Sequence, residues 1–339
     1  MSITQELRSQ IMAQMQGAMA LNIAFIGISN NIFRALADME KAESDEIADK
    51  TGLDKGYMLR WCDAAFAFGL LDEAGGKFIL TDLGRAFIPD ALGTAMPFAV
   101  QAVLSAHMAE RTASLMKSGE RPGEKVLAER ESILLLFGPM LEAMFSGLFE
   151  QQILPNVPAY KDVDEKGGVA VDLGCGNGWY LRKMAARFLN LRGIGLDGFE
   201  ENINQSTKLA QGSGFDSRLK FMKGDIYHFT VDEPVDLIAM SRALHHVWDK
   251  KETVFNIIKE HLRPGGSAVI WEPNWPQNRL ELRDPTRRGM AFQNLGEHVQ
   301  GNHFLRPEEI EAEFHLIGMK TSVYLYANGN EAVIVGKKP

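Results

Sequence analysis

A glycine-rich loop is the first segment of the chain whose residue types and spacing suggest chemistry. Residues 172–178 read Asp-Leu-Gly-Cys-Gly-Asn-Gly and continue the apolar run 169–171. Such glycines let the backbone turn tightly and leave room for a ligand to lie against it. A dinucleotide fingerprint has its third glycine where this chain has the large Trp179. The carboxylate of Asp172 would repel a pyrophosphate, whereas it would attract a ligand that carries an ammonium group.

A pair of adjacent histidines is the second candidate. His245 and His246 follow the apolar segment 235–240. A neutral imidazole can accept a proton near pH 7, so either side chain is a candidate general base. The two cysteines, Cys62 and Cys175, have no partners at metal-ligand spacing and form no disulfide framework. We expect no metal, because the sequence shows no clustered set of carboxylates near the histidines.

Both candidates lie in a half of the chain where short apolar segments alternate with helical ones. This alternation predicts an α/β fold, a Rossmann-like doubly wound parallel sheet with helices on both faces. Such sheets bind ligands at the carboxyl ends of their strands. The expected strands are residues 169–173, 192–197, 219–225, 235–240 and 267–272.

The N-terminal half reads as mostly helical. Ser44 and Asp54 are expected to cap two successive helices, and residues 70–80 form a short hairpin around Gly75 and Gly76. Helix, turn, helix and hairpin together indicate a winged-helix unit. The pattern predicts two domains: a helical dimerisation and substrate-wall domain over residues 1–155, and a sheet domain over residues 165–339.

Proline positions and apolar residues give further expectations for the N-terminal half. Helices are expected over residues 94–154 with breaks at Pro97, Pro122 and Pro139, followed by a linker over residues 155–168. The apolar residues between Leu21 and Leu36 are too many for one face of a helix, so we expect a homodimer.

The glycine loop and the strand ends resemble, in order and spacing, the class I S-adenosylmethionine-dependent methyltransferases. The resemblance implies S-adenosyl-L-methionine as cofactor. In this family an acid at the place of Asp197 holds the ribose hydroxyls, an Asp at the place of Asp225 contacts the adenine amino group, and the neighbour, here Ile226, packs on the ring. The implied cofactor-binding residues are Asp172, Gly174, Gly176, Gly178, Asp197, Asp225, Ile226 and Ser241.

A winged-helix module ahead of such a domain resembles the small-molecule O-methyltransferases of the caffeic-acid and hydroxyindole type. The resemblance implies that His245 takes the proton from the acceptor hydroxyl, with His246 as the alternative base. Glu272 would orient the histidine or the substrate. The pair could also be structural, since Leu-His-His occurs in class I methyltransferases that need no base. The segment between Glu272 and Arg306 is expected to cover a small, aromatic or polyketide-like acceptor.

Two alternative functions stay open at this point. The first is N- or C-methylation in the same frame, which works by proximity. The second is a ligand-sensing winged-helix transcription regulator. Eight Lys and Arg stand against thirteen Asp and Glu in residues 1–90, and the whole chain carries a net charge of −8. Nucleic-acid binding needs a basic surface, so we expect none.

The chain is also expected to be cytoplasmic and to act without a membrane. Its N-terminus lacks a basic segment followed by an apolar run, which argues against a signal peptide. The longest apolar stretch noted, residues 21–28, falls short of the roughly 18 residues that a membrane span needs.

Overall fold

The computed structural model describes residues 3–339, which divide into two compact units. The first unit comprises Met1–Glu110 and Arg130–Ala143, and the second comprises Arg111–Glu129 and Met144–Pro339. The second unit therefore takes a short segment that lies inside the N-terminal half of the sequence.

The first unit contains the helix–turn–helix and the hairpin expected from the sequence. Asp54 caps its helix by accepting a hydrogen bond from the backbone N–H of Tyr57, as expected. Ser44 is the first residue of its helix and not the cap: Glu43 takes that place and forms a reciprocal capping box with Glu46. The helices and strands that begin in this unit are α1 (Gln5–Ser29), α2 (Ile32–Met39), α3 (Ser44–Thr51), α4 (Lys55–Ala67), β1 (Leu71–Ala74), β2 (Lys77–Leu80), α5 (Asp82–Arg85), α6 (Met96–Leu115) and α8 (Glu131–Leu148).

The core of this unit forms where α1 passes α2 and α4. The rings of Phe33 and Trp61 lie edge to face, with centroids 5.6 Å apart, and the indole N–H of Trp61 donates to the carbonyl of Ile23. A Cβ at Gly27 would come within 2.5 Å of Phe33 and 2.7 Å of Trp61. Glycine at position 27 therefore allows the two aromatic residues to pack against the backbone of α1.

Two expectations about proline are wrong. Pro139 lies inside α8 and does not end it. An internal proline costs about 3 kcal/mol through one lost hydrogen bond and a steric clash, yet α8 continues past it to Leu148. The expected linker, residues 155–168, folds into α9 (Leu154–Asn156) and α10 (Pro158–Glu165). Both helices carry their proline in the first turn, where its fixed φ suits a helix start.

Helix α1 exposes an unusually apolar surface. Leu7, Ile11, Met15 and Met19 recur at a spacing of four residues, and each is 43–57% exposed. By length and composition α1 is the one helix of the described chain that could cross a membrane. The sequence count missed it because isolated Gln, Asn and Gly residues interrupt the apolar run without adding charge.

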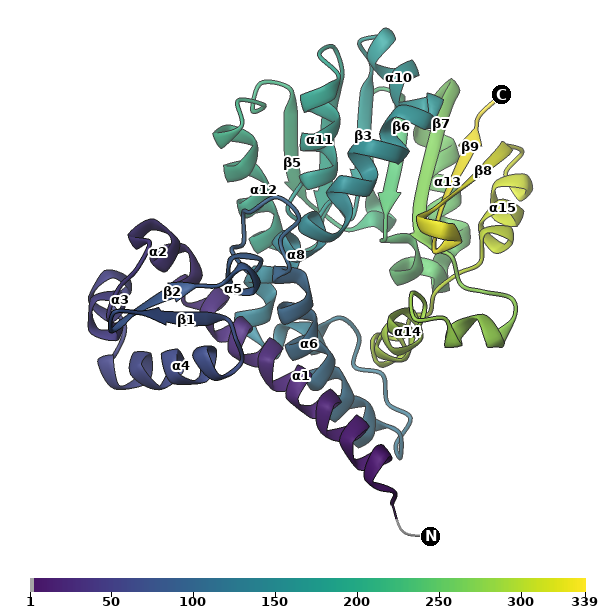
Figure 1. Ribbon diagram of the computed structural model, residues 1–339. Helices are drawn as coiled ribbons and strands as arrows, with labels where there is room; N and C mark the ends of the chain where they lie inside the picture. Colours follow the sequence, from purple (N-terminus) through teal and green to yellow (C-terminus); the bar gives the residue numbers. More distant parts are fainter. Residues whose placement is uncertain (1–2) are drawn as a thin grey trace. The chain divides into compact units, whose positions relative to one another are not determined.

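The second unit is built on a seven-stranded sheet (Figure 1). Its strand order is β5-β4-β3-β6-β7-β9-β8, with β9 antiparallel to both of its neighbours and the first five strands parallel. All five expected strands are present, and two antiparallel strands that were not expected extend the sheet. The bounds are β3 (Val169–Leu173), β4 (Arg192–Asp197), β5 (Leu219–Lys223), β6 (Val235–Ser241), β7 (Leu262–Pro273), β8 (Lys320–Tyr326) and β9 (Glu331–Lys337).

Helices connect the parallel strands and cover both faces of the sheet. The chain runs outward from β3 to β5 on one side and from β6 to β7 on the other, so right-handed crossovers place the two sets of helices on opposite faces. The remaining elements of the unit are α7 (Lys125–Ala128), a π-helix η1 (Phe149–Ile153), α11 (Trp179–Arg187), α12 (Glu200–Gly212), α13 (Lys251–His261), α14 (Arg288–Gln300), α15 (Pro307–Leu316) and the 3-10 turns η2 (Ile226–His228), η3 (Leu244–Lys250), η4 (Arg279–Arg283) and η5 (Ala327–Gly329).

The parallel register brings polar residues to one edge of the sheet. Asp172 and Asp197 stand at the carboxyl ends of β3 and β4, and Ser241 ends β6 level with Trp271 of β7. Glu272 follows directly in β7. The candidate residues from four strands therefore face a common end of the sheet, where ligands bind in this class of fold.

An aromatic cluster packs behind this edge. Phe149, in the π-helix, is fully buried and stacks on Tyr180 at a centroid distance of 4.4 Å. It also lies parallel to Trp271 at 5.9 Å and edge to face against Tyr160 at 5.6 Å. One side chain thus joins the π-helix, α10, α11 and β7.

We therefore expect Phe149→Ala to lower the free energy of unfolding by about 3–5 kcal/mol, because it would leave a cavity among rigid rings. Urea denaturation would measure this loss. Leu316→Ala, at a side chain that is 78% exposed, is the control and should change stability by less than about 0.5 kcal/mol. A loss below about 1 kcal/mol for Phe149→Ala would show that the cluster does not hold these elements together.

Candidate active site

The glycine loop leaves β3 in a conformation that other residues rarely adopt. Gly174, Gly176 and Gly178 have φ values of 80°, 51° and 74°. A Cβ at Gly178 would also lie 2.6 Å from the ring of Phe221. Nothing lies within 4 Å of the Cβ position at Gly176, so the loop is open at its centre. The backbone here is shaped for a ligand to approach it closely.

Asp172 is a buried carboxylate at the base of this loop. It is 1% exposed, and its Oδ1 atom has no hydrogen-bond partner among residues 3–339. Burial, and secondarily the charge of Asp197, raise the pKa of Asp172 to about 8. The Oγ atom of Ser241, at the end of β6, is likewise buried without a partner among the described residues. Both atoms are available to a bound group.

Asp197 ties the loop to β4. Its Oδ2 atom accepts a hydrogen bond from the backbone N–H of Gly176 at 2.9 Å. Its Oδ1 atom accepts from the backbone N–H of Phe199 and from the side-chain amide of Asn202. The carboxylate therefore has a structural role in the loop, whatever it contacts in a ligand.

The structure places Asp225 and Ile226 beside Asp197, because the backbone N–H of Gly224 donates to the carbonyl of Asp197. Asp225 is exposed, and its carboxylate caps the 3-10 turn η2 by accepting from the N–H of Tyr227. Ile226 is half-buried and packs against the main core. The predicted cofactor residues thus come together at the carboxyl ends of β3, β4, β5 and β6.

His245 and Glu272 form a buried pair at the same edge of the sheet. Nδ1 of His245 lies 2.7 Å from Oε2 of Glu272. The other oxygen of Glu272 accepts from the backbone N–H groups of Leu244 and His245, so the carboxylate is fixed at both ends. Burial opposes ionisation of Glu272, but the charge and hydrogen bond of His245 and the charge of Arg242 outweigh it and lower its pKa.

His246 has a different set of partners. Its Nδ1 atom lies 3.1 Å from Oε1 of Glu124, 4.0 Å from Oε2 of Glu297 and 2.9 Å from the side-chain amide of Asn302. Burial works against its charged form, yet the hydrogen bond that His246 donates to Glu124 and the charge of Glu297 prevail and raise the pKa of His246. The two imidazole rings lie 4.1 Å apart.

Glu297 and Glu124 are site residues that the sequence did not reveal. Glu297 lies on α14 within the segment expected to cover the substrate, and its Oε2 atom is 3.7 Å from Nε2 of His245. Glu124 precedes α7, over 100 residues before the histidines in sequence. The expectation that no carboxylates cluster here is wrong, because Glu272, Glu297 and Glu124 all contact the histidine pair. The three acids lie on separate segments without a motif to join them.

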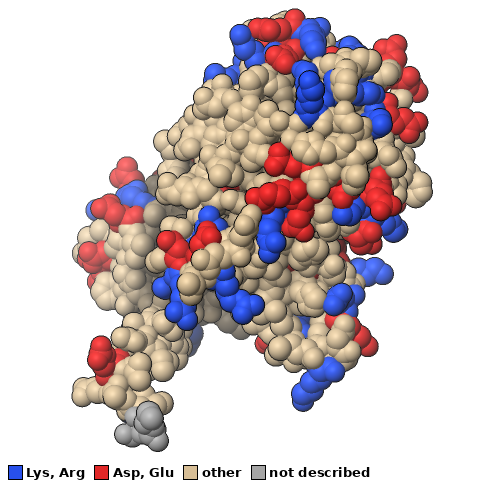
Figure 2. Space-filling model, turned by 90° about the vertical axis from the view of Figure 1, so that its right-hand side faces the viewer, with Lys and Arg blue, Asp and Glu red and all other residues tan. Residues whose placement is uncertain are grey.

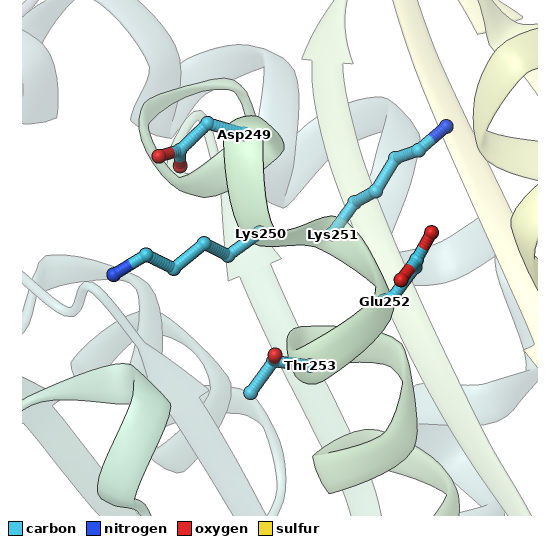
Figure 3. Close-up of a pocket in the computed structure, with 5 residues that line it drawn as sticks. All are labelled: Asp249, Lys250, Lys251, Glu252 and Thr253. Atoms are coloured by element: carbon cyan, nitrogen blue, oxygen red, sulfur yellow. The ribbon is translucent and has the colours of Figure 1, made fainter.

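A surface hollow of about 240 Å³ lies at the start of α13. Figure 3 shows that its lining comes from the consecutive residues 249–253 and that Lys250 and Lys251 point in opposite directions. Lys251 is paired with Glu313, and Lys250 lies over the ring of Tyr227. These side chains do not converge on one point, so the histidine cluster is the stronger candidate for the active site.

Comparisons with known proteins agree with this geometry. Residues 170–266 match the family model of a methyltransferase domain. The sterol 24-C-methyltransferase of Saccharomyces cerevisiae is 28% identical over 144 residues, which are 42% of this chain and 37% of that protein. The chain therefore matches little more than a third of the length of that relative.

Two solved structures resemble the whole chain. An O-methyltransferase family protein from Burkholderia thailandensis has a TM-score of 0.73 at 14% identity, and the match covers 99% of both chains. Human N-acetylserotonin methyltransferase, solved in complex with S-adenosylmethionine, has a TM-score of 0.74 at 18% identity over 99% of both chains. Together with the family model, these likenesses confirm the expected fold class, and the second of these structures holds the expected cofactor, S-adenosyl-L-methionine.

The pKa of Asp172 leads to a test in the ligand-free protein. An acid whose pKa rises from its ordinary value near 4 to about 8 on folding binds a proton more tightly in the folded state. The free energy of unfolding should therefore fall as the pH rises from about 4 to about 8. In the Asp172→Asn variant, the loss of unfolding free energy over this pH range should be smaller than in the wild type by roughly 2–5 kcal/mol. Urea denaturation at pH 5 and pH 8 measures it.

Asp216→Asn, at an exposed carboxylate, is the matched control and should keep the slope of the wild type. If Asp172→Asn and the wild type lost stability in parallel between the two pH values, Asp172 would be ionised in the free protein.

Proposed function

We propose that this chain, which carries a class I methyltransferase domain, transfers a methyl group from S-adenosyl-L-methionine to an oxygen of a small acceptor. The observation that carries the proposal is the buried His245–Glu272 pair, which lies at the same sheet edge as the glycine loop and Asp172. An aromatic or polyketide-like acceptor with an acidic hydroxyl suits a single histidine base.

The residues at the strand ends fit this cofactor. The unpartnered Oδ1 of Asp172 suits the ammonium group of the methionine part, and pairing with a cation would favour the ionised carboxylate. The open backbone at Gly176 leaves space for the ligand. Asp197 and Asp225 would hold the ribose and the adenine amino group, with Ile226 against the ring and Ser241 facing the bound molecule. When bound, the sulfonium supplies the activated methyl group.

The task of the protein is then to orient the acceptor and remove its proton. With Nδ1–H donated to Glu272, the neutral His245 carries its lone pair on Nε2. That atom takes the proton of the acceptor hydroxyl and leaves an alkoxide or phenolate as the nucleophile. Glu272 holds the ring in this tautomer and stabilises the imidazolium that forms. Glu297, 3.7 Å from Nε2, adds a second negative charge on the protonated side.

We expect His245→Gln to lower turnover by about 10²–10⁴-fold, because a positioned base contributes that much. Cofactor affinity, measured by calorimetry, should stay nearly unchanged. Raising the pH should partly restore turnover on a phenolic acceptor, since the solvent then supplies the phenolate. Transfer of radiolabelled methyl groups to a panel of phenols gives the rates.

His246→Gln is the comparison variant and should be milder, because Nδ1 of His246 is engaged by Glu124. If the His246 variant were the slower of the two, the base would be His246. If neither variant slowed turnover tenfold, the enzyme would act by proximity. N- or C-methylation would then be the better proposal, and the sterol C-methyltransferase relative adds weight to that alternative.

The proposal includes a homodimer that forms through the first unit. The residues between Leu21 and Leu36 do not provide its surface as expected, because several of them, such as Phe33 and Leu36, are buried in the core of the unit. The exposed apolar face of α1, with Leu7, Ile11, Met15 and Met19, is more than isolated surface residues explain. A second copy of the chain would bury it. The helical N-terminal part would then serve as a winged-helix dimerisation module.

Replacing Ile11 and Met15 together by Glu should convert a dimer to a monomer, because both side chains would carry charge into the contact. Sedimentation velocity at micromolar concentration measures the change. Leu189→Glu, at a side chain that is 75% exposed on the second unit, is the control and should leave the dimer intact. A wild-type protein that sediments as a monomer would contradict the proposal.

We propose a cytoplasmic location and no nucleic-acid or membrane partner. The first 90 residues carry a net acidic charge, and basic and acidic side chains are interspersed on the face shown in Figure 2. A duplex-DNA binder would need a basic stripe along one element. This charge distribution favours the enzyme over the winged-helix regulator.

A further inference from the structure

The surroundings of the histidine pair contain more ligand atoms than proton transfer requires. His245 Nε2, His246 Nδ1 and a carboxylate oxygen of Glu297 all lie within 4.8 Å of one another. An oxygen of Glu124 lies 3.1 Å from His246 Nδ1. We propose that His245, His246 and Glu297 form a binding site for one divalent transition-metal cation of the Zn²⁺ class, with the carboxylate of Glu124 beside it.

The distances between the donor atoms are close to those of a coordination sphere. Zn²⁺ binds imidazole nitrogen at about 2.0–2.1 Å and carboxylate oxygen at about 2.0–2.2 Å, so ligands of a tetrahedral site lie about 3.3 Å apart. Glu297 Oε2 is 3.7 Å from His245 Nε2 and 4.0 Å from His246 Nδ1. Side-chain shifts of well under 1 Å would close these separations around an ion.

The surrounding hydrogen bonds already orient His245 as a metal ligand. Metal-binding histidines usually donate their other ring N–H to a carboxylate, which fixes the tautomer and raises the basicity of the ligand nitrogen. The Nδ1 atom of His245 makes this contact with Glu272 at 2.7 Å. Glu272 is completely buried and is itself fixed by backbone N–H groups. With Nδ1–H donated to Glu272, Nε2 is the nitrogen left to bind an ion, and it lies 3.7 Å from Oε2 of Glu297.

Charge and ligand type select the cation. Two imidazoles and the Glu297 carboxylate around a divalent ion leave one positive charge, and the neighbouring carboxylate of Glu124 balances it. Imidazole suits Zn²⁺ and its neighbours, whereas Mg²⁺ prefers oxygen ligands alone. Glu124 belongs to the same compact unit as both histidines and Glu297, so the three ligands and the balancing carboxylate come from one folded unit.

The consequence for activity rests on the proposed function. A metal ion and an acceptor proton would compete for the same lone pair on Nε2 of His245. Metal-bound protein should therefore be inactive as a methyltransferase, and a chelator should restore activity. The site would make turnover sensitive to the concentration of free transition metal.

The first experiment measures binding by the full-length protein without acceptor or cofactor. Calorimetry with Zn²⁺ alone should show one ion per chain, and Co²⁺ should give the visible absorption of a low-symmetry site. His246→Gln and Glu297→Gln should each weaken Zn²⁺ binding by at least about 100-fold, since they remove a ligand outright. His315→Gln, at an exposed histidine bound to Thr321, is the matched control and should bind Zn²⁺ like the wild type.

Circular dichroism of each variant shows whether it is folded, and Mg²⁺ should give no binding heat at the same concentration. Absence of a stoichiometric Zn²⁺ site, or a site that survives both His246→Gln and Glu297→Gln, would overturn the proposal. Stoichiometric binding that leaves methyl transfer unaffected would uphold the site and would instead contradict His245 as the base. The two failures are thereby distinguishable.

Discussion

The uncompensated carboxylate of Asp172 is the constraint on which the cofactor side of the structure depends. Ionising a buried carboxyl group whose Oδ1 atom has no partner is costly, and a second acid, Asp197, ends the neighbouring strand. The parallel register of β3 and β4 enforces this proximity. The loop between them relieves only part of the cost, because Asp197 accepts from Gly176 while Oδ1 of Asp172 accepts from no described residue. A cationic group of a ligand beside Oδ1 of Asp172 would offset the rest of this cost.

Glu272 shows the opposite solution at the same edge of the sheet. It is as deeply buried as Asp172, but both of its oxygens accept hydrogen bonds and His245 stands beside it. The pKa of Asp172 is accordingly raised, whereas that of Glu272 is lowered. The carboxylate of Glu272 is stabilised by His245 within the protein, whereas that of Asp172 would be stabilised by a positive charge on a bound ligand. This difference in environment suits the two proposed roles, cofactor binding for Asp172 and proton transfer for the His245–Glu272 pair.

Sequence patterns predicted the elements and residues whose signals are local. The glycine loop, the acids at strand ends and the five parallel strands follow from neighbours in the chain, and the structure contains all of those elements. Glu124 and Glu297 were missed because their roles arise from tertiary packing that joins distant segments. The helices at 154–165 differ from the expected linker for a local reason: their prolines lie in the first helical turns, and proline starts helices as well as breaking them.

The two histidines show how one added side chain changes what a site can do. His245 with Glu272 alone is an oriented imidazole of the kind that the proposed proton transfer needs. Glu124 and Glu297 both lie close to His246, and positive charge on the histidines would stabilise both carboxylates. A proton on His246 can supply this charge. Its contact with Glu124 accordingly raises the pKa of His246 and lowers that of Glu124. In the proposed metal site, a divalent cation supplies positive charge to the same four side chains and also binds the lone pair on Nε2 of His245. A proton and a metal ion would therefore compete for the same cluster of two histidines and two glutamates, and the concentration of free metal would decide which one is bound.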